Sequence, residues 1–357
     1  MIEFLLNIGI DPNSEDSHGL TPLLVASTQN NTKVSELLLQ YGADINKKNK
    51  MGISPLLSCC AGGEWDFARF LIENGADPNT SSKNMRPLLF ALDSDRFDIA
   101  NLLVKHGADV NAKSDNDEET TLLHQLASLG VINGVEFLLN HGAEIDPVGL
   151  SVFTPLIFAC AEGHTRVVDL LVKRGANVNI MLRDHFGGFM TPLLMASLKG
   201  NTTIAKVLIN NGADVNRISS LSEGELCPLV AAAFQGHVQM VHLLINQGAN
   251  INILVEGPHG AGKITPLMAS IALGKEETAR ALIERGARLD VTCTGLDDAS
   301  GFTPLMMASY IEHVGCVSLL LEKGVDRNAV DSKGRTALMI AQEAGNKQIV
   351  DLLSSCD

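Results

Sequence analysis

Residues 154–179 read TPLIFACAEGHTRVVDLLVKRGANVN, and this stretch decides how the chain folds. Threonine followed by proline predicts a helix start, because threonine caps the first turn and proline needs no hydrogen-bond donor there. Gly163 predicts the end of this short helix, because glycine readily adopts the left-handed conformation that closes helices. Apolar residues at three- and four-residue spacing then predict a second helix that stops at Gly175.

The same pattern recurs along the chain. Similar starts occur ten times, at Thr21, Ser54, Arg86, Thr121, Thr154, Thr191, Cys227, Thr265, Thr303 and Thr336. In the first nine units a glycine follows 21 residues after the start. The position that ends the first helix is glycine in most units and is otherwise Asn30, Asp95 or Glu312. One helix pair cannot bury its apolar face alone, so the repetition predicts stacked pairs with a continuous core.

This pattern resembles the ankyrin repeat. GADVN at 212–216 and TPLLMASLKG at 191–200 match the family signature, and the resemblance covers residues 1–353. It implies an all-α ankyrin-repeat solenoid of about ten helix-turn-helix units, with β-hairpin-like fingers between them. The family's usual histidine after Thr-Pro-Leu occurs only as His124. We therefore expect aliphatic packing to replace the contact that this histidine makes between repeats.

The copies differ in the length of the finger that precedes each start. Most short fingers have seven residues, whereas four consecutive fingers have 11, 10, 12 and 12, at 180–190, 217–226, 253–264 and 291–302. We expect a single array, divided into a half repeat at 1–13, regular repeats at 14–179, long-finger repeats at 180–328 and a capping repeat at 329–357. Because residues 1–13 supply only a second helix and turn, the native chain or a capping segment is expected to continue before Met1.

Function is expected where the copies diverge, and the off-core aromatic residues coincide with the long fingers. The residues predicted to bind a partner are Phe186, Phe189, Leu198, Phe234, Leu273, Phe302, Tyr310 and Ile311. Large apolar groups on an exposed face favour a protein–protein interaction module or scaffold, which binds a protein or extended peptide through the concave face and the long fingers of residues 180–311. Two alternatives stay open: these side chains pack against their own fingers, or the chain is a scaffold or substrate-recruiting region of a larger enzyme or ubiquitin-ligase subunit.

Composition excludes several other functions. Lys+Arg 27 against Asp+Glu 41 gives a net charge of −14, which argues against nucleic acid as a partner. Residues 226–255 lack charged side chains, but polar residues and glycines interrupt them, so we predict a helix pair and no membrane insertion. The cysteines occupy positions typical of small core residues, which favours a reducing compartment, the cytoplasm or alternatively the nucleus.

A catalytic site is not expected. The finger GPHGAGK at 257–263 has the spacing of a phosphate-binding loop. However, Ile264 stands where a hydroxyl would bind magnesium, and Pro266 removes a donor, so we interpret this finger as an insertion rich in turn residues. We therefore predict no enzymatic activity, no cofactor, no metal and no small-molecule substrate.

Overall fold

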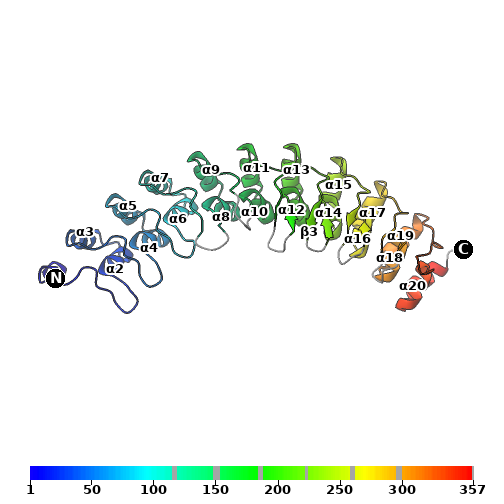
Figure 1. Ribbon diagram of the computed structural model, residues 1–357, viewed down its shortest axis with the longest axis horizontal. Coiled ribbons are helices and arrows are strands. Elements are labelled where there is room, and N and C mark those ends of the chain that lie inside the picture. The colour runs from blue at the N-terminus through cyan, green and yellow to red at the C-terminus, as the bar shows by residue number, and fades with distance from the viewer. Residues whose placement is uncertain are drawn as a thin grey trace. The chain divides into compact units, whose positions relative to one another are not determined.

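The computed structural model describes residues 1–114, 119–147, 153–183, 188–221, 224–257, 262–294 and 300–355. Its contacts divide the chain into two compact units. Unit 1 is Met1–Ala159 and unit 2 is Cys160–Asp357. Each unit is a stack of helix pairs, and a finger connects one pair to the next (Figure 1).

Unit 1 begins with a lone helix that has no partner in the same repeat. Four complete pairs follow, each made of a first helix and a second helix that packs against it. The helices are α1 (Ile2–Asn7), α2 (Pro22–Thr28), α3 (Thr32–Gln40), α4 (Pro55–Gly62), α5 (Trp65–Glu73), α6 (Pro87–Asp93), α7 (Phe97–Lys105), α8 (Leu122–Leu129) and α9 (Ile132–Asn140).

The boundary between the two units lies within α10 (Pro155–Glu162). Unit 2 continues with α11 (Thr165–Lys173), α12 (Pro192–Lys199), α13 (Thr202–Asn210), α14 (Pro228–Gln235), α15 (Val238–Asn246), α16 (Pro266–Ala272), α17 (Glu276–Glu284), α18 (Pro304–Tyr310), α19 (Val314–Glu322), α20 (Ala337–Ala344) and α21 (Lys347–Ser354). The uncharged stretch 226–255 contains α14 and α15, as predicted. Among the described residues, every helix is too short or too polar to cross a bilayer.

The predicted helix signals are confirmed by the local geometry. The Oγ1 atoms of Thr21, Thr191 and Thr265 accept hydrogen bonds from the backbone N–H three residues later. The predicted ends of the first helices all have positive φ, including the departures Asn30 at 52°, Asp95 at 53° and Glu312 at 58°. Threonine, proline and glycine therefore mark the first helices through ordinary capping chemistry.

Three of the four long fingers form antiparallel strand pairs, and all of them lie in unit 2. β1 (Leu182–Arg183) pairs with β2 (Phe189–Met190), β3 (Ser219–Leu221) with β4 (Gly224–Leu226), and β5 (Val255–Glu256) with β6 (Lys263–Ile264). The fourth finger is closed by a single bridge between Cys293 and Phe302. β2 lies beside β3 and β4 beside β5, so neighbouring fingers form one layer.

The core of each unit lies between the paired helices and is almost entirely aliphatic. At the position after Thr-Pro-Leu, Leu194, Val230 and Met268 are buried, which confirms that aliphatic packing replaces the family histidine. His124 is buried as well, and its Nδ1 accepts the Thr121 backbone N–H at 3.0 Å. Burial lowers the pKa of His124 to about 4, so the ring is neutral at physiological pH.

Asparagines at the turns connect successive repeats, and we call this series the asparagine ladder. The Nδ2 of Asn216 donates to Gly248 O at 3.2 Å, and its Oδ1 accepts from Asn250 N at 2.7 Å. Equivalent rungs that contact the next turn start from Asn13, Asn46, Asn79 and Asn111 in unit 1, and from Asn179 and Asn252 in unit 2. The ladder therefore joins turns that belong to successive repeats of the same unit.

The ladder is interrupted once within unit 2. The next rung position is Asp290, whose carboxylate binds Arg288 in the same turn at 3.0 and 2.9 Å. Within the described residues, no hydrogen bond joins Asp290 to the turn at 324–328. A cleft of about 480 Å³ lies at this junction, lined by Asp290, Gly324 and Asp326 among others.

Candidate functional site

The ends of the first helices in unit 2 carry the central part of the predicted partner surface. We call Leu198, Phe234, Leu273, Tyr310 and Ile311 the first-helix row; they belong to the last turns or C-caps of α12, α14, α16 and α18. Leu273 is 54% exposed and Tyr310 is 46% exposed, and the other three are half-buried. Solvent can therefore reach all five residues.

Two further predicted residues come from the first long finger. Phe189 lies on β2 and is half-buried, with the Arg183 guanidinium carbon 5.6 Å from the ring centroid. This geometry is a cation–π contact, which orders both side chains at the surface. Phe186 lies outside the described residues.

Phe302 does not belong to an exposed surface, which corrects the sequence-based prediction. It is only 4% exposed, because its backbone pairs with Cys293 and its ring packs inward. The ring lies 6.2 Å from that of Tyr310, in an edge-to-face arrangement. The buried Phe302 ring therefore packs against the Tyr310 ring and is not itself available to a partner.

The structure also reveals exposed aliphatic residues that the sequence reasoning missed. Ile218, Leu254 and Val330 are exposed, and each lies two residues after a turn asparagine. Their equivalents in unit 1 include Lys48 and Lys113, which are polar. A comparison of the residue two places after each turn asparagine, between the first and the second half of the sequence, would have identified these aliphatic residues.

Metal-ligating side chains and reactive thiols are two groups on which a catalytic site in the described part of the chain could depend. In that part of the chain, no three His, Cys, Asp or Glu side chains come close enough to hold a metal ion. Burial raises the pKa of the Cys59 thiol to about 12 and those of Cys293 and Cys316 to about 11, so these thiols are not activated as nucleophiles.

Most of the finger that resembles a phosphate-binding loop, residues 258–261, lies outside the described residues. At its described end, Lys263 Nζ lies 3.9 Å from Glu256 Oε1 across the β5–β6 pair. A side chain at Gly262 would meet Thr294 Oγ1 at 2.6 Å, so this finger packs closely on the next one.

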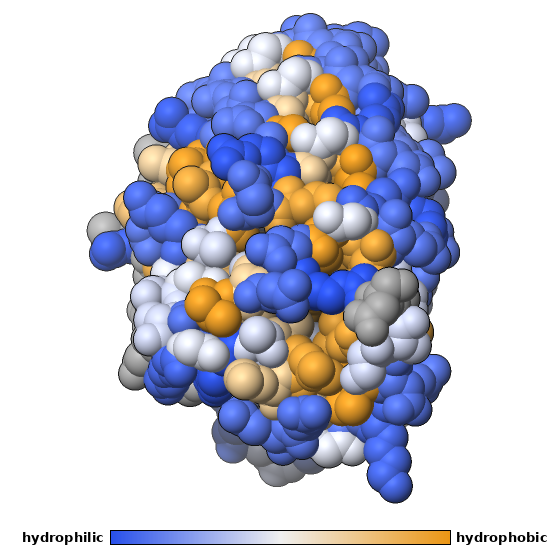
Figure 2. Space-filling view, turned by 90° about the vertical axis from the view of Figure 1, so that its right-hand side faces the viewer, coloured by the Kyte–Doolittle hydropathy of each residue, from blue (hydrophilic) through white to orange (hydrophobic). Residues whose placement is uncertain are grey.

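Apolar surface is visible on the C-terminal side of the molecule, where orange patches are divided by polar residues in blue (Figure 2). Apolar patches with polar surroundings are the usual form of binding surfaces in soluble proteins.

Comparison with known proteins decides the family. A family model described as ankyrin repeats (3 copies) matches residues 1–49, 36–114, 112–184, 193–294 and 290–357. The chain belongs to the ankyrin repeat family. Among solved structures, the crystal structure of the human ASB11 ankyrin repeat domain is similar, with 25% sequence identity and a TM-score of 0.55. The match covers 67% of this chain and 100% of the ASB11 domain. Ankyrin repeats are generally protein–protein interaction modules.

Proposed function

We propose that this ankyrin-repeat chain binds a protein or extended peptide through the first-helix row and the long fingers within residues 180–311. The observation that carries the proposal is the register of the row. Leu198, Phe234 and Tyr310 occupy the same position in their repeats, and Leu273 and Ile311 occupy the next position. Consecutive repeats therefore present large apolar groups at the same end of their first helices. Such groups dominate the binding energy of protein interfaces.

The surroundings of Tyr310 favour binding further. The buried Phe302 ring packs edge-to-face against it, so the tyrosine is held in place before a partner arrives. A preorganised anchor loses little conformational entropy when it is covered. Phe189 is ordered in the same way by Arg183, although that pair lies on a finger.

The proposal is tested by proximity labelling in cells with the intact chain, Phe234→Ala, Tyr310→Ala and the double variant. Leu129→Ala is the matched control, because Leu129 is 59% exposed at the end of α8, a first helix of unit 1. We expect a set of labelled proteins to be lost in the double variant and kept in the control. If the labelled set is the same for all variants, the first-helix row does not bind the partner.

The contribution of the fingers is better measured by substitution than by shortening them. Val255 and Ile264 pair across β5 and β6 and are both buried, so trimming this finger would remove part of the core. Phe189→Ala changes a half-buried side chain at a fingertip pair and leaves those core residues in place. We expect it to weaken the same interaction less than the double variant does.

A further inference from the structure

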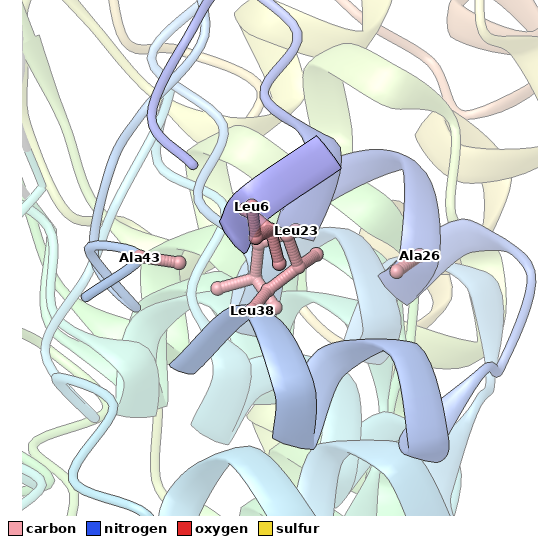
Figure 3. Close-up of a cluster of buried hydrophobic side chains, with 5 residues drawn as sticks. All are labelled: Leu6, Leu23, Ala26, Leu38 and Ala43. Atoms are coloured by element: carbon pink, nitrogen blue, oxygen red, sulfur yellow. The ribbon is translucent and has the colours of Figure 1, made fainter. Parts of the chain in front are cut away.

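The lone helix α1 is held in the position of a second helix. Leu6 on α1 is buried in a cluster with Leu23 of α2 and Leu38 of α3, and their side chains point toward one another (Figure 3). The Tyr41 hydroxyl donates to Asn7 Oδ1 at 2.6 Å, and Asn13 forms a rung to Gly42 and Asp44. These contacts place α1 on the first complete repeat in the same way that second helices are placed elsewhere.

An open apolar cleft of about 570 Å³ lies between α1 and α2. Ile2, Leu5 and Ile10 line it from the α1 side, and Val25 lines it from α2. Leu5 is 37% exposed and Val25 is 40% exposed, although both carry aliphatic side chains. A concave group of exposed aliphatic residues is costly in water, and covering it is favourable.

The repeat pattern indicates what covers this cleft. The first helices α2, α4 and α6 each pack on the second helix of their own repeat and on the first helix of the next, as α2 packs on α3 and α4. A further first helix would therefore contact α1 and α2, which are the two helices that line the cleft. The cleft continues an interface that the chain already uses between its repeats.

We propose that this cleft binds a short amphipathic helix, supplied by a polypeptide outside these 357 residues, in the position of a first helix. Its chemistry follows from α2 and α4, which have seven and eight residues and a leucine-rich face. The rim carries Asp11 and Asp16, and also Glu15, which pairs with Lys47 at 2.9 Å. Asp11 and Asp16 therefore favour lysine or arginine flanking the helix over acidic residues. A second copy of the chain is not the occupant, because the described first helices are packed within their own repeats.

The direct test uses a peptide that copies residues 20–31, crosslinked into a helix through its solvent-facing side chains and labelled for fluorescence anisotropy. We expect saturable binding to the full chain, weakened at least about tenfold by Leu5→Glu or Val25→Glu, because a buried unpaired carboxylate costs more than 1.4 kcal/mol. Phe4→Glu is the matched control: Phe4 is 65% exposed on the same helix and does not line the cleft. Absence of saturable binding, or equal loss in Phe4→Glu, overturns the proposal.

A second test joins the helix to the chain, because short isolated helices are only marginally stable. Gly9 and Gly42 hold equivalent positions 33 residues apart, so Met1 corresponds to Val34 and a copy of residues 21–33 placed before Met1 continues the register. The extended chain should raise the unfolding midpoint of unit 1, followed by the fluorescence of Trp65, the only tryptophan. The same extension with serine in place of its leucines should not. If the two extensions behave alike, the cleft does not accept a first helix.

Sedimentation measurements separate the remaining alternative. A concentration-dependent dimer that disappears in Leu5→Glu would show that a second copy fills the cleft, and it would overturn the choice of occupant. The double variant Phe234→Ala and Tyr310→Ala should leave peptide binding unchanged, since those residues belong to unit 2. The outcome is therefore independent of the proposed function of the first-helix row.

Discussion

Replacing Gly274 with alanine should reveal how strongly neighbouring repeats depend on close contact at the ends of their first helices. Gly274 follows α16 with φ 62°, and an added Cβ would overlap the His313 ring, with Nε2 at 2.6 Å. His313 caps α19, because its Nδ1 accepts the Cys316 backbone N–H at 3.3 Å. Gly345 is the matched control: its φ is 78°, and an added Cβ would meet nothing within 4 Å.

The two substitutions share one cost and differ in another. The left-handed conformation costs a residue with a Cβ about 1–2 kcal/mol, partly offset by about 0.5–1 kcal/mol because glycine loses more entropy on folding. Gly345→Ala should therefore lower the free energy of unfolding by about 1 kcal/mol. Gly274→Ala must also displace the His313 ring and lose its cap, which adds about 1 kcal/mol. We expect a total of about 2 kcal/mol for Gly274→Ala.

The free energies of unfolding are compared by urea denaturation followed by circular dichroism, at equal protein concentration. Hydrogen exchange of the first turn of α19 reports separately on the lost cap. We expect faster exchange of the Cys316 amide in Gly274→Ala and no change in Gly345→Ala. Equal destabilisation by the two variants, with the exchange unchanged, would refute the reasoning that His313 couples these repeats.

Four further predictions concern single positions. Glu312→Gly should raise the free energy of unfolding by about 0.5 kcal/mol, and with it the urea midpoint, since it relieves a left-handed φ of 58°; a lower midpoint would contradict this. Asn216→Asp should lower the free energy of unfolding by about 1 kcal/mol, because a carboxylate cannot donate to Gly248 O. Asp290→Asn should have the opposite effect on thermal stability, by restoring a rung, and Asp290→Ala should not. His124 has a pKa lowered from 6.5 to about 4, so the unfolded state binds more protons and unit 1 loses stability as pH falls from 6.5 toward 4. His124→Leu should reduce this pH dependence in Trp65 fluorescence measurements.

The repeat fold could be predicted because its signals are local. Thr191, Pro192 and Gly200 each act on their own helix, through capping, a preset φ and the left-handed conformation. Arg86 and Cys227 begin helices without a side-chain cap, and the spacing of the other repeats was needed to recognise them. The fold followed from repetition more than from any single start.

The candidate site was predictable only in part, because exposure in a finger depends on contacts between distant residues. Tyr310 and Leu273 were identified from their helix position, and both are exposed. Phe302 was wrongly predicted to lie on the exposed surface, because its pairing with Cys293 decides which way the ring points. The hydrogen bond from Asn216 to Gly248, 32 residues later, depends on how the repeats stack and is not visible in the local sequence.

The buried cysteines allow transient local opening of the repeats to be measured. Cys59 and Cys60 lie within unit 1, and Cys227, Cys293 and Cys316 lie within unit 2, all as free thiols. A thiol reagent reaches them only when a repeat transiently opens, so the reaction rate at each sulfur measures the opening of that repeat without any added label. The native thiols thus allow the effect of a bound partner on each repeat to be followed in the unmodified protein.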